Sequence, residues 1–187
     1  MIIHLNGWPG AGKLTVARVL ARKLGARLLD NHTLHNVAAA LCDRGTDAYW
    51  SLYGQVRDLA YERIRVLPPD AVLVMTNAFL RETPRDVEAW GRIKDLAASR
   101  GDRLVAVTLD CDLDENVVRI SGAGRADNRK LTDPEPLIAW RSEYHLIVDD
   151  AEDWMVVDNT RLAPERAADR IVAYLDGLPP SPRNPAP

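Results

Sequence analysis

The sequence predicts an α/β fold in which helices cover both faces of a parallel sheet. Short apolar segments alternate along the chain with longer amphipathic ones, as they do where crossover helices join parallel strands. The segment Ala71–Thr76 is continuously apolar, which is typical of a central strand buried on both faces.

The first strand should span Ile2–Asn6, an apolar run interrupted by His4. The helix after it should run from about Gly12 to Gly25, where a glycine provides a common C-terminal stop. Its apolar residues recur at helical spacing: Val16, Val19, Leu20 and Leu24. A short strand should follow at Arg27–Asp30. Two helices should come next, at about Leu34–Cys42 and about Ala48–Val66. Turn residues 43–46 separate these helices, and Pro68-Pro69 end the second one.

After the central strand, a helix should begin at Pro84, because Thr83 can cap it, proline suits the first helical position and Asp86 complements the helix dipole. It should end near Arg100, before Gly101. The remaining elements alternate in the same manner: a strand at Leu104–Leu109, helices at Asp112–Ser121 and Asp133–His145, a strand at Trp154–Val157 and a helix at Pro164–Gly177.

Composition excludes several classes of protein. The 187 residues carry a net charge of −3, which argues against a dedicated nucleic-acid binder, and no apolar run is long enough to span a membrane. Two separated cysteines exclude a disulfide framework and fit a reducing, cytoplasmic compartment. The length suits one domain, residues 1–178. Five prolines fall within residues 179–187, which predicts a disordered tail.

Residues Gly7–Lys13 match the G-x-x-x-x-G-K spacing of a phosphate-binding loop. The glycines let consecutive backbone N–H groups turn toward a phosphate, and the following helix directs its positive end to the same place. The loop follows an apolar strand and opens an amphipathic helix, which is the context that the motif requires. Nucleotide contacts are therefore expected from Gly7, Gly10, Ala11, Gly12, Lys13, Leu14 and Thr15.

One position departs from the usual motif. The residue after the lysine is normally Ser or Thr, whose hydroxyl binds Mg²⁺, but here it is Leu14. Either Thr15 contributes the hydroxyl, or water and a carboxylate elsewhere hold the metal.

The chain resembles the P-loop kinases of small molecules and nucleotides, the group that includes adenylate, shikimate and gluconate kinases. The matching features are IIHLNGWPGAGKLT at the start, Asp30 at the end of the second strand, arginines after the fourth strand, and VVDNTRLAPER late in the chain. The chain is also similar to AAA-type kinase-like proteins with a GKLT loop and a KLTDP segment, here Lys130–Pro134. The resemblance implies a five-stranded sheet of order 2-3-1-4-5, with a nucleotide site at the carboxyl ends of the strands.

The resemblance also implies residue roles. Asp30 occupies the place of an aspartate that orients Mg²⁺ or accepts the acceptor's proton, and His32 replaces the second aspartate of that pair. Arg57 corresponds to an arginine that clamps an anionic acceptor, and Asn77 should line the acceptor pocket. Asn159 and Thr160 match a loop that contacts adenine.

A closing lid over the phosphates is expected at about residues 121–133. Its glycine-rich start gives freedom to hinge, and basic residues beside such a hinge can stabilise a transferring phosphoryl group. Arg125 and Arg129 are the expected catalytic arginines, and Arg119 is expected to contact the nucleotide.

These features predict an ATP-dependent, Mg²⁺-requiring phosphotransferase acting on a small hydroxyl- or phosphate-bearing acceptor. Lys13, Asp30, Arg125 and Arg129 would act in catalysis, and Thr15 and Asp30 would face the metal. Two alternatives remain open: a catalytically weak ATP- or GTP-binding regulatory or resistance-type module, and a P-loop kinase that processes nucleic-acid ends.

Overall fold

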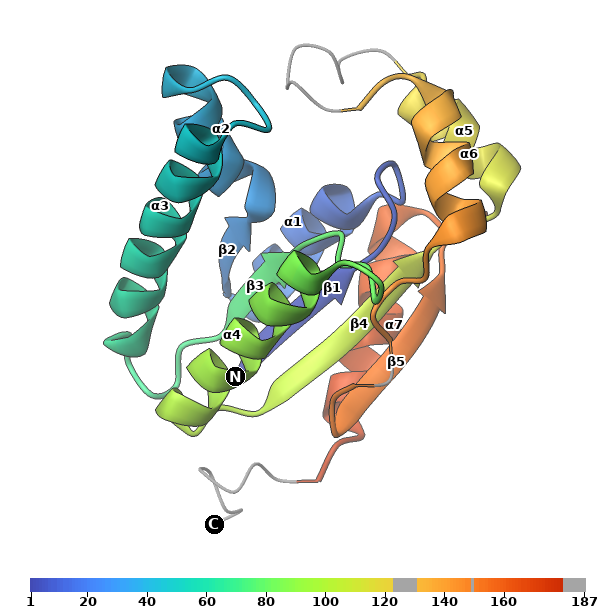
Figure 1. Cartoon of the computed structure of the whole chain (residues 1–187). Helices are drawn as coiled ribbons and strands as arrows, with labels where there is room; N and C mark the ends of the chain where they lie inside the picture. The colour runs from blue at the N-terminus through green and yellow to red at the C-terminus, as the bar shows by residue number, and fades with distance from the viewer. Residues whose placement is uncertain (123–130, 149, 180–187) are drawn as a thin grey trace.

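The computed structural model contains one sheet of five parallel strands in the order β2-β3-β1-β4-β5 (Figure 1). It describes residues 1–122, 131–148 and 150–179. The strands are β1 (Ile2–Asn6), β2 (Arg27–Asp30), β3 (Leu73–Thr76), β4 (Leu104–Asp110) and β5 (Asp153–Asp158). The predicted fold class and strand order are confirmed.

Helices connect the strands near the predicted positions. They are α1 (Lys13–Leu24), α2 (Asn31–Leu41), α3 (Asp47–Arg65), α4 (Pro84–Arg100), α5 (Leu113–Ile120), α6 (Pro134–Glu143) and α7 (Pro164–Asp176). The largest difference is at α2, which starts three residues before the predicted Leu34. Asp30, with extended backbone angles, is both the last residue of β2 and the N-cap of α2, so no turn separates the two elements.

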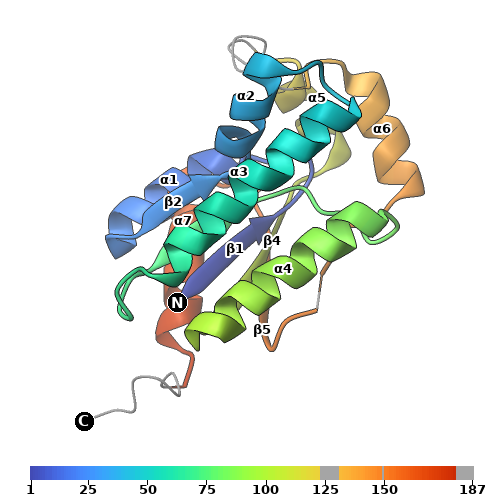
Figure 2. The same cartoon turned by 60° about the vertical axis from the view of Figure 1, so that its left-hand side comes forward.

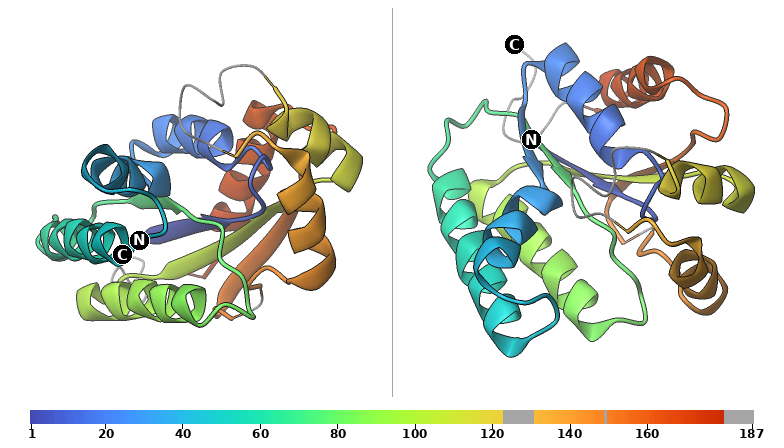
Figure 3. Two further views of the ribbon diagram at one scale, coloured as in Figure 1. Left: turned by 45° about the horizontal axis from the view of Figure 1, so that its top comes forward. Right: turned by 90° about the horizontal axis from the view of Figure 1, so that it is seen from above.

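Two hydrophobic layers hold the sheet between helices. On one face, α1 and α7 bury Val16, Leu20 and Ile171 against strand residues such as Ile3 and Leu5. On the other face, α3 and α4 pack Ile64, Trp90 and Ile93 against Ile2 and Met75. Figure 3 shows the two helical layers on either side of the sheet.

Two helical pairs extend beyond the sheet and frame its carboxyl edge. The α2–α3 pair stands beside β2, and the shorter α5–α6 pair stands on the opposite side (Figures 1 and 2). The loop between β1 and α1 emerges between them, because β1 lies at the centre of the sheet. Residues of both pairs can therefore face this loop.

No helix among the described residues is long and apolar enough to cross a membrane. Cys42 and Cys111 are free thiols, and Cys111 is buried.

Candidate functional site

The residues after β1 form a tight loop that leads directly into α1. Gly10 and Gly12 adopt left-handed backbone conformations, with φ of +89° and +87°, which glycine reaches without a side-chain clash. A Cβ atom at position 10 would also lie 2.5 Å from the Asn116 side-chain nitrogen. The Ala11 N–H donates to the Trp8 carbonyl at 3.1 Å. This geometry suits a loop that binds phosphate with backbone N–H groups and a helix N-terminus.

Lys13, the first residue of α1, folds back across the loop. Its ammonium group donates to the carbonyl oxygens of Gly7 at 2.7 Å and Trp8 at 2.9 Å. Because Lys13 also lines the cleft beside the loop, a phosphate there would compete with these carbonyls for its positive charge.

Asn159, which follows β5, ties that end of the sheet to the loop. Its side-chain amide donates to the Ala11 carbonyl at 2.8 Å. Arg119 of α5 donates to the Asn159 side-chain oxygen at 3.2 Å and to the carbonyls of Asn159 and Thr160 at 3.0 and 3.1 Å. Arg119 also pairs with Glu115 at 2.7 Å. Arg119 is thus part of a network that supports the loop, as well as a residue that lines the cleft.

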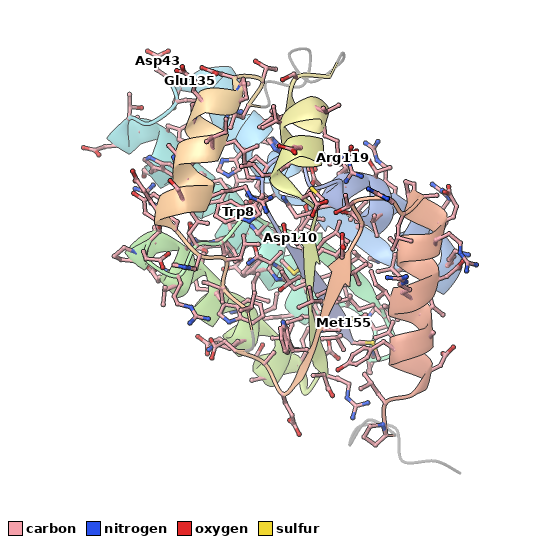
Figure 4. The ribbon with its side chains drawn as sticks, turned by 90° about the vertical axis from the view of Figure 1, so that its right-hand side faces the viewer. Trp8, Asp43, Asp110, Arg119, Glu135 and Met155 are labelled. Atoms are coloured by element: carbon pink, nitrogen blue, oxygen red, sulfur yellow. The ribbon has the colours of Figure 1, made fainter. Side chains whose placement is uncertain are left out.

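A second network supports the loop from α5 and α6. The fully buried Asn116 donates to the Pro9 carbonyl at 2.8 Å and accepts a hydrogen bond from Arg141 at 2.9 Å. Arg141 pairs with Asp110 at 3.3 Å and lies over the Trp8 ring, 5.5 Å from its centroid. Figure 4 shows Trp8 and Asp110 below these helices. Trp8 itself is 5% exposed, so it packs inside the protein.

A cleft of about 800 Å³ opens beside the loop, with residues of the α2–α3 pair and of the α5–α6 pair among its walls. Such a volume is within the range of small-molecule sites. The cleft brings together eleven of the predicted site residues: Gly10, Gly12, Lys13, Leu14, Thr15, Asp30, His32, Arg57, Asn77, Arg119 and Asn159.

The other predicted site residues lie elsewhere. Gly7 and Ala11 are buried within the loop. Thr160 does not line the cleft; its hydroxyl instead accepts a hydrogen bond from the Asp112 N–H at 2.9 Å. Arg125 and Arg129, most of the expected lid and nearly all of the expected tail lie outside the described residues.

Asp30 lies at the carboxyl end of β2, opposite Thr76 of β3 in the strand register. The Thr76 hydroxyl donates to Asp30 Oδ1 at 2.5 Å. Asp30 is only 9% exposed, and what is exposed faces the cleft. Among the described residues no donor reaches Oδ2, so this oxygen is available to a ligand in the cleft.

Oxygen donors for a metal ion also lie here. Asp30 and Thr15 both line the cleft. The described residues contain no cluster of three or more His, Cys, Asp or Glu side chains that could hold a metal ion. A sparse set of oxygen donors fits Mg²⁺, which keeps several waters and commonly binds one or two carboxylates together with phosphate oxygens.

His4, the polar residue of β1, positions one wall of the cleft. Its Nε2 lies 3.0 Å from Asn77 Oδ1. Burial lowers the pKa of His4 to about 4, so the ring is neutral at pH 7 and Nε2–H donates to the amide oxygen. Asn77 lines the cleft, so its side-chain NH₂ can donate a hydrogen bond to a ligand there.

The unfolding free energy should fall as the pH is lowered from about 6.5 to about 4. In this window the unfolded chain binds a proton at His4 that the folded chain does not bind. Each pH unit therefore lowers the free energy of unfolding by about 1.4 kcal/mol. His35, whose pKa burial also lowers to about 4, acts in the same direction. Urea unfolding at pH 7, 6 and 5 measures the slope. His4→Gln keeps a donor for Asn77 and should reduce the slope by about one proton; an unchanged slope would contradict the assignment.

An aromatic wall faces the cleft from α2 and α3. His35 stacks on Tyr53, with ring centroids 4.3 Å apart, and its Nδ1 lies 2.5 Å from the Tyr49 hydroxyl. The Tyr53 hydroxyl donates to Asn31 Oδ1 at 2.9 Å. Trp50 packs edge-on against Tyr53, at 5.9 Å between centroids. These contacts fix the wall in one arrangement.

Sequence reasoning missed several residues of the site. Thr76, Arg85 and Asp86 line the cleft without having been predicted there, and Asn116 supports the loop from beneath. The signal for Thr76 is its place at the end of the central apolar segment. The signal for Asn116 is its position four residues before Ile120, which places a polar side chain on the apolar face of the helix.

Solved structures with the same fold include a sugar kinase, shikimate kinases and an APS kinase. A sugar kinase from Janibacter sp. matches with a TM-score of 0.60 and 20% identity, over 94% of each chain. Shikimate kinase from Aquifex aeolicus matches with a TM-score of 0.56 and 19% identity, over 95% of this chain and 97% of the other. The APS kinase of Mycobacterium tuberculosis, solved with AMPPNP and APS, matches with a TM-score of 0.57 and 17% identity, over 94% and 97%.

No protein-family model and no curated protein sequence matches the chain. At these identities the structural matches show a shared fold. The predicted resemblance to P-loop kinases is confirmed at that level.

Proposed function

We propose that this protein is a nucleotide-dependent phosphotransferase that moves the γ-phosphoryl group of ATP to a hydroxyl or phosphate oxygen of a small acceptor. The observation that carries the proposal is the arrangement of the cleft, where the phosphate loop with Lys13 and the available Oδ2 of Asp30 face the same space. The kinases that share the fold support it.

The chain's own groups account for the steps of the reaction. The loop N–H groups and Lys13 bind the β- and γ-phosphates and stabilise their charge. Asp30 Oδ2 accepts the proton of the acceptor hydroxyl as the oxygen attacks the γ-phosphorus. The bond from that phosphorus to the β–γ bridging oxygen breaks, and ADP leaves. Thr76 holds the other Asp30 oxygen and thereby directs Oδ2 to the acceptor.

Thr15 would hold Mg²⁺ through its hydroxyl oxygen, and Asp30 would orient the waters that the ion retains. The ion would neutralise charge on the phosphates. Arg125 and Arg129 are proposed to close over the transferring group, as lid arginines do in P-loop kinases.

The test is an ATP-dependent phosphorylation screen with hydroxylated metabolites, antibiotics, nucleosides and oligonucleotides with a 5′-hydroxyl. Acceptor-dependent release of ADP, with a labelled phosphate on the acceptor, is the expected result. Binding of AMPPNP with no turnover on any acceptor would favour the regulatory module. Transfer to oligonucleotides, with an affinity that falls steeply with salt, would favour the end-processing kinase.

A further inference from the structure

Three arginines line the cleft from the side of α2, α3 and α4. Arg44 lies in the connection between α2 and α3, Arg57 on α3 and Arg85 on α4. Two carboxylates, Asp30 and Asp86, line the same region. Positive groups therefore outnumber negative ones there by three to two, in a protein whose net charge is −3.

Arg85 is held in place by an aromatic ring. Its Cζ lies 3.7 Å from the centroid of the Trp50 ring, a close cation–π contact. Trp50 is in turn fixed by edge-on contacts with His35, Tyr49 and Tyr53, at 6.0, 5.0 and 5.9 Å between centroids. A guanidinium over the face of a ring keeps its N–H groups in its own plane and directed away from the ring, so they can bind an oxyanion at two points.

Neither Arg85 nor Arg44 forms a hydrogen bond or an ion pair with any residue that the structure describes. Arg57 differs, because it pairs with Asp58 at 2.9 Å and its side chain is 13% exposed. Asp86, the neighbour of Arg85, accepts a hydrogen bond from the Leu80 N–H at 3.0 Å instead of pairing with Arg85.

We propose that Arg85, stacked on Trp50, forms an oxyanion subsite of the acceptor pocket, so that the favoured acceptors are small hydroxylated molecules that carry a carboxylate, sulfate or phosphate group. This inference rests on the proposed phosphotransferase function. It adds to the role expected for Arg57 a second contact, from the neighbouring helix α4. The subsite would orient the acceptor so that its hydroxyl faces Asp30 rather than the aromatic wall.

The first experiment tests anion binding without any turnover. Protein saturated with AMPPNP and Mg²⁺ is titrated with sodium sulfate, and with sodium chloride at equal ionic strength, while the indole N–H resonance of Trp50 is followed by NMR. Trp50→Phe identifies that resonance. We expect a saturable shift with sulfate alone, its loss in Arg85→Gln and its retention in Arg92→Gln. Arg92, also on α4, does not line the cleft and pairs with Glu88.

A shift that persists in Arg85→Gln, or that does not saturate, would overturn the subsite. Failure of the subsite can be told apart from failure of the proposed function. If AMPPNP does not bind, the nucleotide site is wrong, whatever sulfate does at Trp50.

The second experiment uses matched acceptors: hydroxy acids beside their primary amides, and phosphate monoesters beside their dephosphorylated parents. We expect transfer to the anionic member of a pair. Arg85→Gln should raise its KM about tenfold to a hundredfold, with kcat and the KM for ATP nearly unchanged. Arg92→Gln should behave like the parent. Equal transfer to both members would refute the subsite while supporting the phosphotransferase, and the two kinds of pair distinguish a carboxylate from a phosphate.

Discussion

Lys13→Ala should weaken the binding of ATP in Mg²⁺ by about two orders of magnitude or more. A charge-assisted hydrogen bond is worth about 1.5–3 kcal/mol, and one ammonium between two phosphates makes more than one such contact. The loop contains no second cation that could replace it, because Arg119 already donates to Glu115, Asn159 and Thr160. Calorimetry with AMPPNP measures the loss.

The control is Lys23→Ala, on the same helix. Lys23 lies in the last turn of α1, where it pairs with Asp169 at 2.9 Å, and its loss should leave nucleotide affinity unchanged. Lys13 also holds the carbonyls of Gly7 and Trp8, so thermal unfolding of each variant must be measured as well. Equal affinity of parent and Lys13→Ala would remove the basis for a nucleotide site in this loop.

Local patterns in the sequence were sufficient to predict most of the fold. Glycine ends α1 and α4 as expected, and the phosphate loop depends on residues that are adjacent in the chain. The start of α2 was predicted too late, since Asn31, His32 and Thr33 are polar residues that resemble a turn. In the structure they form the first turn of a helix that Asp30 caps.

The contacts that give the site its chemistry could not be predicted in this way. Asp30 and Thr76 are 46 positions apart, and their hydrogen bond depends on the register of β2 against β3. Arg119 and Asn159 are 40 positions apart and meet only when α5 packs beside the loop after β5. The sequence predicted a nucleotide contact for Arg119, but its three hydrogen bonds to Asn159 and Thr160 follow from tertiary packing.

The same limit applies to the wall of the cleft that α3 and α4 form. No role was predicted for Arg85 from the sequence. The structure puts the Arg85 guanidinium over the Trp50 ring, which joins α3 to α4 across a separation of 35 residues. An arginine in the first turn of a helix is usually a solvent-exposed residue without a specific role. Only its place in the wall of the cleft distinguishes Arg85 from such a residue.

Asp30→Asn should lower phosphoryl transfer by about two orders of magnitude or more while leaving the fold and AMPPNP affinity close to those of the parent. An amide oxygen can still accept the Thr76 hydroxyl proton that now bonds to Oδ1, so the end of β2 keeps its hydrogen bond. An amide cannot accept the acceptor's proton, and loss of a positioned base reduces rates by about 10²–10⁴. Single-turnover transfer, measured with the acceptor found in the screen, gives the loss in the chemical step.

Two further variants separate this role from a structural one. Asp43→Asn, in the exposed connection between α2 and α3, is a matched control and should transfer at the parental rate. Thr76→Val removes the hydroxyl that orients Asp30 but leaves the carboxylate, so it should lower kcat by about tenfold and change the KM for ATP little. If Asp30→Asn transfers at the parental rate, the Asp30 side chain has only a structural role as the partner of Thr76, and the proton acceptor must be sought at His32, which lines the same cleft. A loss of rate in Asp30→Asn without one in Thr76→Val would keep Asp30 as the base and show that β2 alone positions it.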